Sequence, residues 1–164
     1  MIAVHILLAT DADWIVDEVT AALGDADTSF TVVRDGRLVA KVVAERNPDV
    51  VITDLQVGTM GGVAITMSLR LDESAGVLPH VPTLILLDRT ADVYIAQRAD
   101  ADGWLIKPVD ALRLRRAVNA VMAGDPYTEG LPAPIEEIDP DMAGDGESTG
   151  EESESPESEP ANAG

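Results

Sequence analysis

Three apolar segments of the chain each lead into charged residues. The segment at residues 4–9 is followed by Asp11 and Asp13. The segment at residues 50–53 leads into Asp54, and the segment at residues 103–106 leads into Lys107. The lysine stands out because the chain has nine arginines and only two lysines. A compact ammonium group meets a phosphoryl group differently from a planar guanidinium. If the fold brings these segment ends together, carboxylates and an ammonium group would share one site.

Each of these residues also has a plainer structural explanation. Asp11 or Asp13 could cap a helix that begins near Trp14, because aspartate is favoured at that position. We expect Asp13 to be the cap, although its carboxylate could also swing into the site. Asp54 could be a loop residue and Lys107 a solvated charge. Asp11, Asp54 and Lys107 together, each after an apolar segment, indicate a functional site more specifically than any one of them does.

The elements that must position these residues alternate between strand and helix patterns. Strands are expected at residues 4–9, 30–33, 50–53, 83–87 and 103–106, and helices at 14–23, 36–46, 62–71, 90–98 and 111–123. Strands that alternate with helices pair in parallel through right-handed crossovers. The sequence therefore predicts a doubly wound, five-stranded α/β domain of flavodoxin-like order 2-1-3-4-5, in which Asp11 faces Asp54. In the second helix, Leu38, Val42 and Val43 are expected to be buried.

The composition changes at Gly124, which predicts a domain of residues 1–124 and a tail of residues 125–164. The domain carries 17 acidic and 11 basic residues, whereas the tail carries 13 acidic and no basic ones. The tail is rich in Pro, Gly, Ser and Glu, and we expect it to be disordered because it has little apolar surface to bury. Its recurring apolar residues are Tyr127, Leu131, Ile135, Ile138 and Met142. They are either scattered linker residues or a short motif that orders on a partner.

The composition also narrows the classes of partner and location. The chain has no cysteine, which excludes disulfides and thiolate metal sites. The apolar run at residues 2–8 is too short for a signal-peptide core or a membrane span, so we expect a cytoplasmic protein without direct membrane insertion. An acidic domain with an acidic tail repels phosphate backbones, and nucleic acid is therefore not an expected partner.

The segments that carry these charges resemble the receiver domain of two-component response regulators. They read ILLATDAD, NPDVVITDLQVGTMGG, VPTLILL and ADGWLIKPVD, and the resemblance covers residues 4–123. It implies that Asp54 accepts a phosphoryl group from a histidine kinase, with Mg²⁺ held by Asp11 and Asp54. It also implies that Lys107 contacts the phosphoryl oxygens and that Trp104 is the switch aromatic residue. Positioning and charge neutralisation by Mg²⁺ and a lysine suit phosphoryl transfer.

Four departures from the family pattern cluster at this site. Thr10 stands where receivers have a second acid, which weakens the Mg²⁺ site, and Leu87 stands where they have a Thr or Ser hydroxyl. Asp88 replaces a small residue, and Gly58 replaces a proline in the loop after Asp54. A hydrogen bond to a charged group contributes ~1.5–3 kcal/mol, which is comparable to a typical allosteric coupling of ~1–3 kcal/mol. Its loss at Leu87 predicts weak or absent switching.

Two functions, neither of them enzymatic, follow from the resemblance and its departures. The first is an atypical single-domain response regulator that acts through protein contacts. The second is a constitutive pseudo-receiver, an accessory subunit of a larger assembly that docks independently of phosphorylation. No helix-turn-helix or basic stretch for DNA binding is recognisable. By the resemblance, the partner face would contain Arg98, Trp104, Arg113, Arg115 and Arg116, although these arginines could equally be solvated.

Overall fold

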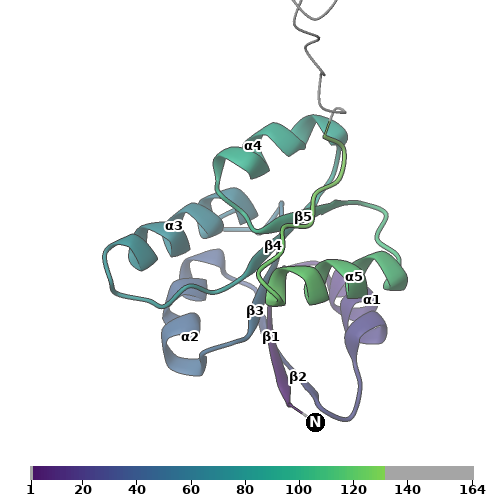
Figure 1. The fold of residues 1–164 in the computed structure, drawn as a ribbon, viewed down its shortest axis with the longest axis horizontal. Coiled ribbons are helices and arrows are strands. Elements are labelled where there is room, and N and C mark those ends of the chain that lie inside the picture. The colour runs from purple at the N-terminus through teal and green to yellow at the C-terminus, as the bar shows by residue number, and fades with distance from the viewer. Residues whose placement is uncertain (1, 132–164) are drawn as a thin grey trace, which may run out of the picture. The chain divides into compact units, whose positions relative to one another are not determined.

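Five parallel strands in the order β2-β1-β3-β4-β5 form the centre of the computed structural model, which describes residues 2–131 (Figure 1). The strands are β1 (Val4–Ala9), β2 (Thr28–Val33), β3 (Val50–Asp54), β4 (Thr83–Leu87) and β5 (Gly103–Ile106). The helices are α1 (Asp13–Leu23), α2 (Val39–Arg46), α3 (Gly62–Ser74), α4 (Val93–Arg98) and α5 (Ala111–Met122), with 3₁₀ turns η1 (Gly36–Leu38) and η2 (Thr90–Asp92). The predicted fold class and strand order are confirmed.

Helices α1 and α5 cover one face of the sheet, and α2, α3 and α4 cover the other (Figure 1). Successive residues of a strand point to opposite faces. In β1, Ile6 and Leu8 accordingly pack in the cluster with α1 and α5, whereas Leu7 and Ala9 pack with α2 and α3. Burial on both faces explains why β3 and β4 are mostly apolar, whereas the edge strand β2 is only partly buried and contains three hydroxyl residues. None of the helices within residues 2–131 combines the length and apolar character that a bilayer crossing requires.

Two of the predicted helices begin with a 3₁₀ turn instead of a regular α-helical turn. A 3₁₀ turn has three residues per turn, so it changes the direction in which the first side chains point. Leu38, at the end of η1, is 49 % exposed, while Val39 and Val43 are buried. The expectation that Leu38 is buried is therefore wrong. The segment predicted as a helix at residues 90–98 is likewise divided between η2 and the six-residue α4.

Packing against the sheet continues beyond Gly124. Residues 125–131 return alongside β5, where Tyr127 forms an isolated parallel bridge with Gly103 and packs against the core beneath α5. The first compact unit accordingly spans Met1–Pro132. It extends past the boundary predicted at Gly124, and residues 125–131 are a packed segment. The other predicted tail residues, Ile135, Ile138 and Met142 among them, lie outside the described residues.

Candidate functional site

The carboxyl edge of the sheet brings Asp54 and Lys107 into direct contact. Asp54 is the last residue of the buried strand β3, and Lys107 follows β5. The Lys107 Nζ donates a hydrogen bond to Asp54 Oδ1 at 2.5 Å. Strand β4 lies between β3 and β5, so the lysine reaches across the end of β4 to the carboxylate. The two residues singled out by their position after apolar runs therefore form an ion pair.

A second carboxylate shares the same ammonium group. Asp88 Oδ1 accepts from Lys107 Nζ at 2.7 Å, and the Asp88 side chain is 35 % exposed compared with 13 % for Lys107. Burial lowers the pKa of Lys107, but its hydrogen bonds to Asp54 and Asp88 outweigh that effect and hold the pKa above its ordinary value. The Trp14 ring adds a cation–π contact, with Nζ 5.7 Å from its centroid. The site thus contains one ammonium group between two carboxylates.

Thr10 provides a neutral hydrogen bond where a second acid was expected from the family pattern. Its buried Oγ1 donates to Asp54 Oδ2 at 3.4 Å and accepts from the backbone N–H of Ala12 at 3.1 Å. The backbone N–H of Gln56 donates to Asp54 Oδ1, also at 3.4 Å. Of the two Asp54 oxygens, Oδ2 therefore has the weaker partners and is the freer to react.

Asp11 lies at the end of β1, next to β3 in the sheet, and its side chain is exposed to solvent. Its Oδ2 occupies space that a larger residue at position 58 would need, since a Cβ built on Gly58 would lie 2.8 Å from this oxygen. Within residues 2–131, no group of three or more His, Cys, Asp or Glu side chains has the arrangement of a metal site. Mg²⁺ is often held by one or two carboxylates with several waters retained. Asp11 and Asp54 follow neighbouring strands and supply the two carboxylates that such a hydrated ion would need.

Comparison with known proteins identifies the family to which this site belongs. The model of the response regulator receiver domain matches residues 6–119. The chain belongs to the response regulator receiver family. It is 28 % identical over 120 residues to the protein PilH of Pseudomonas aeruginosa, covering 73 % of this chain and 98 % of PilH. It is 29 % identical over 120 residues to the transcriptional regulatory protein CseB of Streptomyces avermitilis, covering 72 % of this chain and 48 % of CseB.

Solved structures of receivers share the fold. The chemotaxis response regulator CheY4 of Vibrio cholerae superposes with a TM-score of 0.63 at 24 % identity, covering 72 % of this chain and 98 % of CheY4. The response regulator ChrA of a heme-sensing two-component system gives 0.62 at 26 % identity, covering 77 % of this chain and 60 % of ChrA. The chain spans about half the length of CseB but nearly all of PilH and CheY4. It is a signalling module of the two-component type.

The prediction that Asp13 caps the first helix is wrong. Asp13 is the first residue of α1, the cap position belongs to Ala12, and no side chain caps the helix. Its carboxylate instead accepts from Arg34 Nη2 at 2.6 Å, while Arg34 Nη1 donates to the carbonyl of Asp11 at 3.2 Å. The Asp13 carboxylate binds Arg34, and it therefore does not replace the acid that receivers have at the position of Thr10.

Leu87 and Trp104, the two residues predicted to act in switching, belong to one cluster of the core. Leu87 and Trp104 pack in one cluster with Ile85 and Val93, and Trp104 is only 3 % exposed. The indole Nε1 donates to the carbonyl of Glu129 at 2.8 Å. Trp104 therefore has its polar contact with the segment after α5, and its side chain is buried in this conformation.

The arginines predicted to form a partner face point in different directions. Arg98 on α4 donates to the Tyr94 hydroxyl at 3.0 Å. On α5, Arg113 binds Glu129, whereas Arg115 Nε donates to the carbonyl of Ala22 at 2.7 Å. Residues two apart on a helix are separated by about 200°, which explains why Arg113 and Arg115 turn away from each other. Arg116 is exposed on the same helix and Trp104 is buried, so the members of the predicted set differ in both exposure and contacts.

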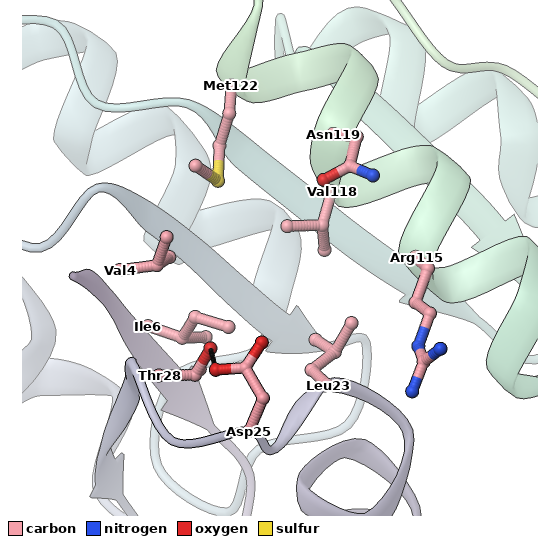
Figure 2. A pocket seen from close by; sticks show the side chains of 9 residues that line it. All are labelled: Val4, Ile6, Leu23, Asp25, Thr28, Arg115, Val118, Asn119 and Met122. Carbon is pink, nitrogen blue, oxygen red and sulfur yellow. Dashed lines mark hydrogen bonds between the residues drawn. The ribbon is translucent and has the colours of Figure 1, made fainter. Parts of the chain in front are cut away.

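Two hollows of the receiver differ in their relation to the charged site. A cavity of about 400 Å³ lies between α5 and the amino-terminal ends of β1 and β2, as Figure 2 shows. Asp25 in that cavity accepts from Thr28 Oγ1 at 2.7 Å, and this bond lowers the pKa of the Asp25 carboxyl. A groove of about 660 Å³ between α3 and α4 instead includes Leu55, Gln56 and Asp88. This second hollow borders the charged site through Asp88, which binds Lys107, and the sequence did not indicate it.

Proposed function

We propose that this receiver is an atypical single-domain response regulator that acts through protein contacts, with weak or absent switching at Asp54. The observation that carries this proposal is the sharing of Lys107 between Asp54 and Asp88. In a responsive site, the lysine would be available to the phosphoryl oxygens. Here one of the two ion pairs of Lys107 is with Asp88, a carboxylate other than the proposed phosphoacceptor. The site therefore holds an anion at Lys107 before any phosphoryl group arrives.

In the reaction that the site supports, Asp54 Oδ2 attacks the phosphorus of a phosphohistidine, and the bond between phosphorus and the histidine nitrogen breaks. Bound Mg²⁺ would supply charge neutralisation to the transferring group, with Asp11 and Asp54 as its protein ligands. Thr10 orients Oδ2 through its hydroxyl, and Lys107 must turn from Asp88 toward the new phosphoryl oxygens. Phosphorylation would thus break one ion pair to form another.

The electrostatic effect of Asp88 is large enough to weaken phosphorylation. Two unit charges about 4 Å apart interact with roughly 4 kcal/mol at the effective dielectric constant near a protein surface. Solvent at the partly exposed Asp88 reduces this repulsion. Even a third of it would change an equilibrium about tenfold, because ~1.4 kcal/mol corresponds to a factor of ten. Slow or weak phosphorylation at Asp54 is the expected result.

The residues around Leu87 also favour weak transmission of a phosphorylation event from Asp54 to Trp104. A leucine has no hydroxyl to bind a phosphoryl oxygen, and Leu87 is fully buried against Trp104. The indole N–H is meanwhile occupied by the Glu129 carbonyl. A phosphoryl group at Asp54 would therefore lack a hydrogen-bonded connection through position 87 to Trp104.

A constitutive pseudo-receiver, docked as an accessory subunit of a larger protein assembly, is the second candidate. It is favoured by the same Asp88–Lys107 pair, because an internal carboxylate neutralises the lysine without phosphorylation. A histidine kinase would be a partner under the first proposal and is unnecessary under the second. The two candidates differ in one property, which is whether Asp54 binds a phosphoryl mimic and transmits that event.

Tryptophan fluorescence during titration with beryllofluoride and Mg²⁺ measures this property. Trp14 reports on the site because its ring lies 5.7 Å from Lys107 Nζ. For the atypical regulator we expect a weak but saturable change that is absent in Asp54→Asn. No change in a folded protein would favour the pseudo-receiver. Tight saturation together with a shift of the Trp104 emission would contradict both and indicate an ordinary switching receiver.

A further inference from the structure

The groove between α3 and α4 presents an apolar surface next to the charged site (Figure 1). Its apolar lining comes from the turn after β3 and from both helices, and consists of Leu55, Val63, Ala64, Met67 and Ile95. Met67 on α3 is 56 % exposed and Ile95 on α4 is 40 % exposed, so each helix contributes one large apolar side chain that is open to solvent. A groove of this kind suits the apolar face of a helix.

Two carboxylates also line this groove, and their charges are balanced differently. Asp92 is buried and accepts from the backbone N–H of Arg89 at 3.1 Å and from its Nη2 at 3.0 Å. Asp88 is 35 % exposed and shares the ammonium group of Lys107 with Asp54. Among residues 2–131, Lys107 is the one donor to the Asp88 carboxylate, and it binds Oδ1. Asp88 Oδ2 can therefore accept from a cation in the groove.

The group formed by Asp54, Lys107 and Asp88 has two negative charges and one positive charge. When a phosphoryl group at Asp54 draws Lys107 toward its oxygens, Asp88 loses that cation and attracts another. In the opposite direction, a cation bound at Asp88 releases Lys107 for the phosphoryl group. The two events favour each other equally, because the effect of one ligand on the affinity for another is reciprocal.

We propose that the groove binds a helix of a partner protein that presents a lysine or arginine beside apolar residues, and that this cation replaces Lys107 at Asp88. The net charge of −19 favours the approach of a basic partner. The coupling between partner and phosphoryl group rests on the proposed function at Asp54. It gives the receiver an output that does not pass through Leu87 and Trp104, since the movement of Lys107 links Asp54 to the groove.

Binding is tested with the full-length chain and a synthetic amphipathic helical peptide of leucine, alanine and lysine. Two matched peptides have norleucine or glutamate in place of lysine. We expect the methyl NMR signals of Met67 and Ile95 to shift, with the lysine peptide bound roughly fivefold more tightly than the norleucine peptide, as a partly exposed ion pair gives. Asp88→Asn should abolish this preference. Asp17→Asn should retain it, because Asp17 is an exposed carboxylate on α1, which covers the other face of the sheet.

Three results would overturn the groove as a site for a basic helix. The first is the absence of binding, and the second is equal affinity for the lysine and glutamate peptides. The third is a set of shifts confined to methyl groups outside the groove.

Replacement of Lys107 is measured without a phosphoryl mimic. The chain has two lysines, so isotope labelling of lysine gives one signal for Lys107 and one for Lys41 as an internal reference. The lysine peptide should shift the Lys107 signal, because its bond to Asp88 is lost, and should leave the Lys41 signal in place. An unmoved Lys107 signal with the groove occupied would overturn the replacement.

The coupling is measured as the affinity for beryllofluoride in the presence of Mg²⁺. The lysine peptide should increase this affinity roughly fivefold, at the low end of allosteric couplings, and should have no effect in Asp88→Asn. An unchanged affinity although the Lys107 signal moves would overturn the coupling. If beryllofluoride binds neither the unaltered chain nor Asp88→Asn, the proposed function at Asp54 fails, while the Lys107 signal still decides whether the cation replaces Lys107 at Asp88.

Discussion

Strand β5 lies between two charged clusters that use ion pairs in opposite ways. At the carboxyl end of the strand, the single ammonium group of Lys107 is divided between Asp54 and Asp88. On the outer edge, the single carboxylate of Glu129 receives the guanidinium of Arg113 and the N–H of Ile106. The first cluster has two carboxylates for one cation, and the second has two donor groups for one carboxylate. The difference separates a site that can exchange partners from a contact that holds structure.

The two cations suit these different tasks. Lys107 is a point charge on a flexible stem, so it can turn from one carboxylate to another anion with little change in geometry. Arg113 has a planar group that binds a carboxylate through two parallel hydrogen bonds, and such pairs are geometrically specific. The site at Asp54 is thus suited to rearrangement, and the contact at Glu129 is suited to holding residues 125–131 in place.

The largest effect on this comparison is expected from Lys107→Met. Removing one partner of a largely buried ion pair leaves uncompensated charge, and we expect a loss of about 3 kcal/mol in the free energy of unfolding. Urea denaturation measures it. Lys41→Met is the matched control, because Lys41 is the other lysine of the chain and its Nζ lies 3.9 Å from an exposed Glu45. A cost for Lys107→Met no larger than that of the control would contradict the importance of the ion pair.

Acidification should open the second cluster before the rest of the domain. Burial raises the pKa of Glu129, but the bonds from Arg113 and Ile106 outweigh burial and hold the pKa below its ordinary value of 4.5. The stabilisation is therefore complete above about pH 4.5 and is lost as the pH falls through the lowered pKa. The charged and titratable groups that face the Glu129 carboxylate are Arg113 from α5 and Tyr127 from residues 125–131. Amide exchange at Ile106, corrected for intrinsic rates, should rise in this range. Glu129→Gln should remove the pH dependence, and its persistence there would exclude Glu129 as the titrating group.

A smaller change is expected from Thr10→Asp at the first cluster. This substitution adds the acid that the family pattern has at position 10 and supplies another anionic ligand beside Asp54. We expect Mg²⁺ to bind roughly tenfold more tightly, because ~1.4 kcal/mol of added attraction is modest for a charge at this distance. Isothermal calorimetry with Mg²⁺ measures the affinity, with Thr20→Asp on the far side of α1 as the control. Unchanged affinity would mean that Asp11 and Asp54 do not form the metal site.

The sequence predicted the sheet, its strand order and the placing of Asp54 and Lys107 at the same edge of the sheet. These features depend on buried apolar runs and on residues at strand ends, where position in the chain determines position in the fold. The errors occurred where one side-chain contact or one turn decided the outcome. Asp13 is favoured as a cap by its type, but Arg34, distant in sequence, binds its carboxylate. Leu38 has helical spacing, but a 3₁₀ turn directs it to solvent.

The packing of residues 125–131 beside β5 was missed for a different reason. The composition of this segment resembles that of the acidic residues that follow, and composition alone does not distinguish a segment that packs from one that does not. Its one aromatic residue, Tyr127, was a signal that could have indicated packing, as was the pair of glycines at positions 124 and 130. The ion pair between Asp88 and Lys107 was also missed, although Asp88 was recognised as an unusual charge, because the direction of its side chain depends on the fold.

The most direct test of the account is the affinity for beryllofluoride in the presence of Mg²⁺ after Asp88→Asn. This change removes the competing charge at Lys107 while preserving the size of the side chain. Asp13→Asn is the control, because Asp13 is a nearby carboxylate that binds Arg34 instead of Lys107. We predict that Asp88→Asn binds beryllofluoride about tenfold more tightly than the unaltered chain, corresponding to ~1.4 kcal/mol, while Asp13→Asn does not. Equal or weaker binding by Asp88→Asn would contradict the claim that Asp88 competes with a phosphoryl group for Lys107.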